Sequence, residues 1–120
     1  MIGGYDPVSY YAGQAARGEA RLNHVWNGAV WCFSTEENRN VFRADPENYA
    51  PHFVGYCACA ASQGYKVPGD PNVFALHDGK LYLLVHPRAQ KLWSADIPLF
   101  ISRGETNWPR IHPFWPRASR

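Results

Sequence analysis

The feature that most constrains this chain is a pair of turn signals placed 51 residues apart. Asn27-Gly28 and Asp78-Gly79 each lie between runs rich in β-branched and aromatic residues. Both dipeptides favour the positive φ angles of a type I′ turn, so each predicts a β-hairpin. A helix-start signal follows each hairpin, at Ser34 and at Pro87. The chain is therefore predicted to contain two hairpin-plus-helix units.

The helix of the first unit has a signal at its start. Ser34 and Glu37 match a capping box, in which the two side chains satisfy backbone amides that the helix leaves unpaired. The expected helix runs from about Thr35 to Ala44, with Val41 and Phe42 buried against the hairpin. Asp45 follows and precedes Pro46. A residue before proline disfavours helical geometry, so the helix is expected to end there.

A shift of 51 residues superposes the two units. It pairs Gly28 with Gly79, Trp31 with Tyr82, Phe33 with Leu84, Phe42 with Trp93, Ala44 with Ala95, Asp45 with Asp96 and Tyr49 with Phe100. Two unrelated units of this kind would also place a turn glycine and a helix aromatic at similar distances, so duplication and coincidence both explain the matches. Either explanation predicts helices and hairpins packed around one shared core.

One α+β domain is predicted for the whole of residues 1–120. The length and the 46% hydrophobic content suffice for one core and argue against two. The first unit is assigned to residues 22–49, a linker to 50–72 and the second unit to 73–101. Residues 107–120, with three prolines and two tryptophans, are expected to lie extended over the surface.

Composition argues against nucleic-acid and membrane functions. The 12 Lys and Arg residues are scattered and nearly balanced by 10 Asp and Glu residues, so no basic face is predicted. No run approaches the roughly 18 apolar residues that a membrane span requires. The first residues also lack the charged and apolar pattern of a leader, although a chain cut at a mature domain would read in the same way.

The chemistry-bearing residues are few. Phosphate-binding glycine loops, nucleophile elbows, His-Glu-x-x-His and Cys-x-x-Cys are all absent from the sequence, which favours binding over catalysis. Cys32, Cys57 and Cys59 are an odd number, so at least one thiol is free or pairs between chains. Cys57 and Cys59 are too close in sequence to bridge each other readily. Asp6 is assigned to turn chemistry at the surface.

Copper or zinc is a candidate ligand, because thiolates and imidazoles suit both metals. Cys57 and Cys59 share a face if the segment is extended, and diverge by about 200° if it is helical. His52 lies five residues before Cys57, and His24 lies near the start of the first hairpin. The candidate metal ligands are Cys57, Cys59, His24 and His52. The alternative is that the cysteines fill space and the histidines are solvated, with His86 capping a helix.

Several motifs together resemble the YHS-domain family, and its small bacterial members in particular. They are Gly4-Tyr-Asp-Pro-Val-Ser-Tyr10, Phe33-Ser-Thr-Glu-Glu-Asn38, Phe42-x-x-Asp-Pro-x-x-Tyr49, Ala50-Pro51, Gly55-Tyr-Cys-Ala58, Asp78-Gly-Lys-Leu-Tyr82 and Asn107-Trp-Pro109. The resemblance implies a YHS/TRASH-like fold. It also implies a link to metal handling, since such domains occur beside copper-transporting ATPases. Its small members usually carry an export leader, which implies a periplasmic or secreted protein.

The chain departs from the metal-binding members of that family at three positions. Where they have the cysteine of Asp-Pro-Val-Cys, this chain has Ser9. Where they have a Cys-x-x-x-Cys pair at the helix start, it has Ser34 and Asn38. Serine and asparagine are poor ligands for soft metals, so the family's usual site is not expected to operate. Cys57 matches a cysteine of the exported members.

Three functions follow from these observations. The first is a small binding module of the bacterial envelope that holds copper or zinc through Cys57 with one or two histidines. The second is a metal-free interaction domain that docks a protein partner with Trp108, Phe114 and Trp115. The third is a thiol-dependent enzyme with Cys57 as its nucleophile. The sequence does not specify an oligomeric state.

Overall fold

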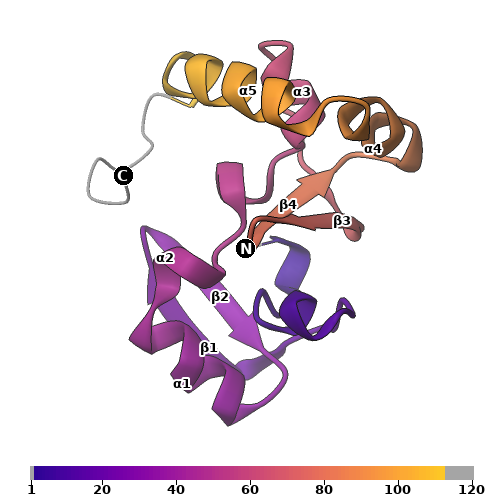
Figure 1. Ribbon diagram of the computed structural model, residues 1–120. Coiled ribbons are helices and arrows are strands. Elements are labelled where there is room, and N and C mark those ends of the chain that lie inside the picture. Colours follow the sequence, from indigo (N-terminus) through magenta and orange to yellow (C-terminus); the bar gives the residue numbers. More distant parts are fainter. Residues whose placement is uncertain (1, 113–120) are drawn as a thin grey trace.

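Both turn signals form the expected hairpins in a computed structural model of the chain, which describes residues 2–112 (Figure 1). Strand β1 (Glu19–Trp26) pairs antiparallel with β2 (Ala29–Phe33), and β3 (Asp70–His77) with β4 (Lys80–Leu84). The turn residues have φ angles of 58° and 75° at Asn27-Gly28, and 50° and 73° at Asp78-Gly79. Positive φ at both positions is the type I′ geometry, so the turn prediction is confirmed.

A helix follows each hairpin, as the sequence predicts. Helix α1 (Glu36–Ala44) follows β2, and α4 (Pro87–Ser94) follows β4. The remaining helices are α2 (Pro46–Tyr49), α3 (Ala58–Ser62) and α5 (Ile97–Ile111), with short 3-10 turns η1 (Ile2–Gly4), η2 (Ser9–Ala12) and η3 (His52–Gly55). Residues 2–112 form one small α+β domain with two separate two-stranded sheets.

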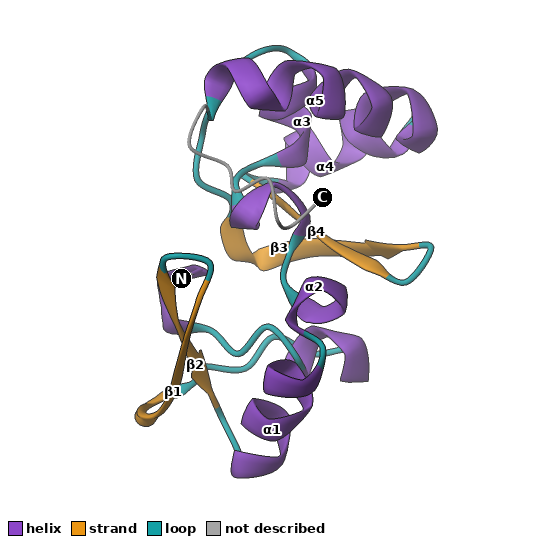
Figure 2. Ribbon diagram, turned by 90° about the vertical axis from the view of Figure 1, so that its left-hand side faces the viewer, coloured by secondary structure: helices purple, strands orange, loops and turns teal. Residues whose placement is uncertain are grey.

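The β3–β4 hairpin lies in the middle of the molecule. In Figure 2, helices α3, α4 and α5 form a layer above it, and the first unit with α1 and α2 lies below. Leu81 and Leu83 of β4 pack on the N-terminal segment, while Tyr82 and Leu84 pack among the helices. Because successive strand residues point to opposite faces, this short strand is buried on both sides.

The buried residues divide into three clusters, where the sequence predicts one shared core. The first unit buries Leu22, Trp31, Phe33 and Phe42. The N-terminal segment buries Ile2 and Tyr10 with Leu81 and Leu83. The largest cluster contains Phe53, Cys57, Ala58, Cys59, Ala61, Tyr82, Leu84, Ala89, Trp93 and Trp108. The division arises because the two hairpins do not join into one sheet, and Val54 packs against both the first and the largest cluster.

The start of α1 differs from the predicted capping box. Thr35 is the N-cap, and its Oγ1 accepts a hydrogen bond of 3.1 Å from the Asn38 amide. The Ser34 hydroxyl instead donates to the Asp6 carboxylate. Asp6 is fully buried, so the prediction that it lies at the surface is wrong. The helix therefore begins one residue later, since the carboxylate of Asp6 competes for the Ser34 hydroxyl. Val41 is also 40% exposed, in contrast to the prediction of burial.

Helix α5 corrects the prediction of an extended tail for residues 107–120. The helix continues to Ile111, because two side chains near its end are anchored. Trp108 is only 4% exposed and packs 5.2 Å from the Phe53 ring. The Asn107 side-chain amide donates to the carbonyls of Ala61 and Ser62, at 3.0 and 3.2 Å. Residues 113–120, with Phe114 and Trp115, lie outside the described part of the chain.

Candidate functional site

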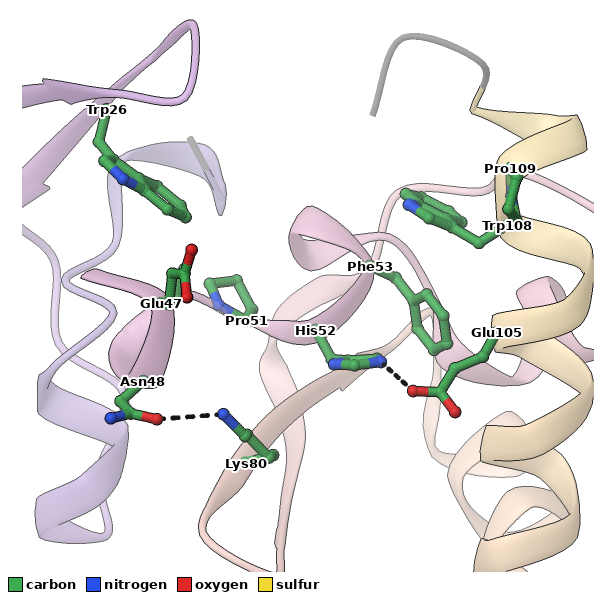
Figure 3. A pocket seen from close by; sticks show the side chains of 11 residues that line it. Trp26, Glu47, Asn48, Pro51, His52, Phe53, Lys80, Glu105, Trp108 and Pro109 are labelled. Atoms are coloured by element: carbon green, nitrogen blue, oxygen red, sulfur yellow. Dashed lines mark hydrogen bonds and ion pairs between the residues drawn. The ribbon is translucent and has the colours of Figure 1, made fainter. Parts of the chain in front are cut away.

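A cavity of about 510 Å³ opens where the first unit faces α5 (Figure 3). It is lined by Trp26, Glu47, Asn48, Ala50, Pro51, His52, Phe53, Lys80, Glu105, Trp108 and Pro109, and we call it the His52 cleft. Its volume lies within the range of small-molecule sites, which are commonly mostly apolar with a few polar groups. The residues come from both units and from the linker, so the cleft exists only in the folded chain.

A strained turn builds the middle of the cleft. Phe53, Val54 and Gly55 have φ angles of 56°, 56° and 87° in succession, which is the left-handed region. This conformation is rare for aromatic and β-branched residues and costs free energy that the surrounding structure must supply. Gly104 of α5 provides the room, because a Cβ atom added there would lie 2.7 Å from the Phe53 ring. The packing of Phe53 against Gly104 thus fixes the linker to α5.

His52 and Glu105 form the polar centre of the cleft. The Nε2 atom of His52 lies 3.2 Å from Oε2 of Glu105, and the His52 ring packs against Phe53 and Tyr82 at 4.5 and 5.1 Å. Burial lowers the pKa of His52 below its ordinary value of 6.5. Glu105 acts in the opposite direction, and the nearby Lys80 lowers the pKa further. Burial therefore favours the neutral form of His52, and its Nε2 atom faces the Glu105 carboxylate.

Lys80 connects the two units across the floor of the cleft. Its Nζ donates a hydrogen bond of 3.2 Å to Oδ1 of Asn48 in α2 (Figure 3). The Asn48 backbone carbonyl in turn accepts a hydrogen bond of 3.0 Å from the Tyr11 hydroxyl. Burial raises the pKa of Tyr11 to about 12, so this donor stays protonated at neutral pH. These contacts hold α2 against the second unit through Lys80 and against the N-terminal segment through Tyr11.

Aromatic rings stand on both sides of the cleft. Trp26 lies on the first-unit side near Glu47, whereas Phe53 and Trp108 lie on the side of α5 (Figure 3). The Trp26 ring is held by an edge contact of 5.9 Å with Phe42. Both walls are therefore built on ring packing within the buried clusters and present fixed aromatic surfaces to the cavity.

Cys57 and Cys59 line a different cavity, of about 480 Å³, which we call the Cys57 cavity. Cys57 is fully buried at the N-cap of α3, where its Sγ accepts a hydrogen bond of 3.4 Å from the Ala60 amide. Burial raises the pKa of the Cys59 thiol, and Cys57 raises it further. His86 also lines this cavity, and its Nδ1 caps α4 as predicted, accepting a hydrogen bond of 3.0 Å from the Ala89 amide.

The four candidate metal ligands lie in three different places. Cys57 and Cys59 share the Cys57 cavity, and His52 faces Glu105 in the His52 cleft. His24 lies on β1, with its ring 6.3 Å from that of Phe42. Within residues 2–112, no three His, Cys, Asp or Glu side chains are grouped as metal ligands. The combined set is therefore not brought together, because α3 draws the cysteines into the core and Glu105 engages His52.

The three positions that differ from the metal-binding YHS members meet around Asp6. Its Oδ2 accepts hydrogen bonds from the Ser34 amide, the Ser34 hydroxyl and the Asn38 side chain, at 2.9, 2.8 and 2.8 Å. The Ser9 hydroxyl donates to the Asp6 carbonyl at 2.7 Å and accepts from the Ala16 amide at 3.0 Å. Hydroxyl and amide groups engaged in this way do not fit a soft metal.

The sequence did not indicate the charged residues of the cleft. Glu47, Lys80 and Glu105 are single charges in three separate elements, and Trp108 fell in the segment predicted to be extended. A usable signal was Asp96, two residues before Pro98. Its Oδ1 accepts from the Leu99 amide at 3.4 Å and caps α5. A helix starting there would have placed Glu105 and Trp108 on one face.

Comparisons with protein-family models, with curated proteins and with solved structures gave no significant match. Across residues 2–112, no helix combines the length and the apolar character needed to cross a bilayer. The function of the chain must therefore be inferred from its own cavities and side chains.

Proposed function

We propose that the protein is a binding module that holds a small organic ligand in the His52 cleft. The observation that supports this proposal is the composition of the cleft: aromatic side chains from the first unit, the linker and α5 surround a paired histidine and glutamate. Pockets of this size, with fixed apolar walls and a few polar groups, are typical of small-molecule sites. The strained backbone at Phe53 and Val54 adds support, because such strain often occurs at ligand sites.

Binding fits the cleft better than catalysis does. Among the described residues, its lining contains no serine, threonine, tyrosine or cysteine side chain that could act as a nucleophile. Cys57, the nucleophile of the thiol-enzyme hypothesis, is fully buried in the other cavity and caps α3 through its sulfur. The His52 and Glu105 pair can orient a ligand through hydrogen bonds.

A fragment screen by two-dimensional NMR tests this function. Organic fragments that bind should shift the amide signals of the cleft lining. Trp26→Ala should weaken fragment binding because it removes one aromatic wall. Tyr65→Ala is the matched control, since Tyr65 is an exposed aromatic residue outside the cleft. Fragments that shift only signals elsewhere, or that bind equally to both variants, would contradict the proposal.

A transition metal at the Cys57 cavity is a second candidate function. It is favoured by the two thiols, which are donors that copper and zinc accept. The imidazole of His86 lines the same cavity but is not grouped with both thiols as a metal ligand within residues 2–112. Stoichiometric Cu(I) binding should be lost in Cys57→Ala and weakened in Cys59→Ala. Cys32→Ala is the control, because Cys32 lies on β2 outside this cavity. Unchanged affinity in Cys57→Ala would end this candidate.

The YHS resemblance and the envelope location that it implies are also proposals. The meeting of Ser9, Ser34 and Asn38 at Asp6 supports the resemblance, because three cysteines there would share one site. The triple substitution to cysteine should therefore create a Zn²⁺ site. A folded triple variant that fails to bind zinc would contradict the correspondence.

Trp108, one of the three residues of the metal-free docking hypothesis, is not available to a protein partner. Trp108 is buried between α5 and the linker, so its ring does not form an exposed docking surface. Phe114 and Trp115, its other residues, lie outside the described part of the chain.

A further inference from the structure

The charges of the His52 cleft are unequal. Glu47 and Glu105 contribute two carboxylates, whereas Lys80 contributes one ammonium group. His52 adds no positive charge at neutral pH, since burial lowers its pKa. Within residues 2–112 the net charge of the lining is therefore negative, although the protein as a whole carries a formal charge of +2. A cleft focuses such a local field on the ligand that enters it.

The ammonium group of Lys80 is held at one end of the cleft by a neutral side chain. Its Nζ is bound to Asn48 Oδ1, on the side of α2. Glu105 stands on α5 and is half exposed, with one carboxylate oxygen engaged by His52. The other carboxylate oxygen of Glu105 is open to a cationic ligand. Glu47, an exposed side chain on the first-unit wall, provides the second carboxylate.

The walls of the cleft suit the same kind of ligand. Trp26 offers the more exposed ring of the lining, whereas Phe53 and Trp108 are only 3% and 4% exposed and close the opposite side of the cleft. The face of an aromatic ring carries partial negative charge and attracts cations. Tryptophan is the most effective of the aromatic side chains in this interaction. The same rings also accept an apolar or aromatic body by stacking.

We propose that the His52 cleft selects a small organic cation with an apolar body. The cationic group faces the carboxylates of Glu105 and Glu47, and the apolar body lies between the aromatic walls. This inference rests on the proposed binding function and specifies its ligand class. An organic ammonium ion fits better than a metal ion, because no three metal-ligating side chains are grouped anywhere in residues 2–112.

Three probes that share one apolar body and differ in charge test the proposal. Phenethylammonium is a cation at pH 7, 2-phenylethanol is neutral and phenylacetate is an anion. Calorimetric or NMR titration of the full chain should give the tightest binding for phenethylammonium and the weakest for phenylacetate. The differences in affinity between the three probes should decrease as salt is added, because screening weakens charge interactions at exposed groups.

Substitutions of single charges should change this order in a predictable direction. Glu105→Gln and Glu47→Gln should each weaken phenethylammonium binding by roughly two- to fivefold, and should leave 2-phenylethanol unchanged. Lys80→Gln should strengthen phenethylammonium and weaken phenylacetate. Glu37→Gln is the matched control, because Glu37 is exposed on α1 and outside the cleft.

The outcomes separate this inference from the proposed function. If the three probes bind in the cleft with equal affinity, or phenylacetate binds best, cation selection is overturned and the binding function stands. If none of them binds, cation selection is again overturned, and the fragment screen with Trp26→Ala decides the binding function independently. Cation binding that Glu105→Gln and Glu47→Gln both leave unchanged also overturns the inference.

Discussion

At the scale of single residues, Asp6 shows how much one buried group can organise. Turn chemistry explains only its Oδ1 contact of 2.8 Å with the Val8 amide. The other oxygen accepts the donors of Ser34 and Asn38, which come from another part of the chain. A buried carboxylate is tolerated only with such partners. The sequence could not reveal them, because they lie 28 and 32 residues away.

Asp6→Asn should destabilise the protein. The asparagine would place an NH₂ donor among the amide and hydroxyl donors that now converge on the carboxylate, leaving donors unpaired. We expect a loss of about 2–3 kcal/mol in the free energy of unfolding, measured by urea denaturation. Asp78→Asn, at an exposed turn position that accepts either residue, is the control and should change little. Equal stability of the two variants would refute this role of Asp6.

His52 should titrate below its ordinary pKa of 6.5 in the folded protein. As the pH is lowered, His52 is therefore protonated in the unfolded chain before it is protonated in the folded protein. The contribution of His52 to the free energy of unfolding is complete above pH 6.5. It declines as the pH falls from 6.5 to the lower folded value. Imidazole NMR should measure the lowered pKa directly. Glu105→Gln should lower it further, since Glu105 raises it, and Glu37→Gln should not change it. A pKa at or above 6.5 would contradict this environment.

At the scale of elements, short-range signals predicted the hairpins and the two helices that follow them. Turn dipeptides act locally, and so do the helix-start signals at Ser34 and Pro87, so their effects survive in the fold. Helix α5 has a local start signal in Asp96 and Pro98, but its C-terminal end depends on distant contacts, such as that of Asn107 with Ala61. The capping shift from Ser34 to Thr35 has the same origin, in Asp6.

Gly104→Ala should destabilise α5 and disturb the cleft together. Alanine is the better helix former by about 1 kcal/mol, but its Cβ would lie 2.7 Å from the Phe53 ring. We expect a net loss of roughly 1–3 kcal/mol, because the Phe53 ring must move in a packed region. Ser102→Ala, at an exposed position of the same helix, should be neutral or stabilising. Thermal unfolding of the two variants provides the comparison, and a stabilised Gly104→Ala would disprove the tight contact.

At the scale of the whole molecule, the cleft is a product of tertiary structure. Its aromatic and charged residues come from β1, α2, η3, β4 and α5. The sequence named two of them as candidates, His52 as a metal ligand and Trp108 as a docking residue. Sequence reasoning placed the chemistry at Cys57, whereas the fold buries that thiol and opens its larger cavity elsewhere. Local sequence patterns do not show which distant elements will lie on the two sides of a cleft.

A small organic cation is proposed to bind between the aromatic walls of the His52 cleft. Intermolecular nuclear Overhauser effects between phenethylammonium and the full chain would locate it. We expect contacts from the phenyl protons to the rings of Trp26 and Phe53, and from the methylene next to nitrogen to Glu105. Contacts confined to the Cys57 cavity, or no contacts at saturating phenethylammonium, would contradict it.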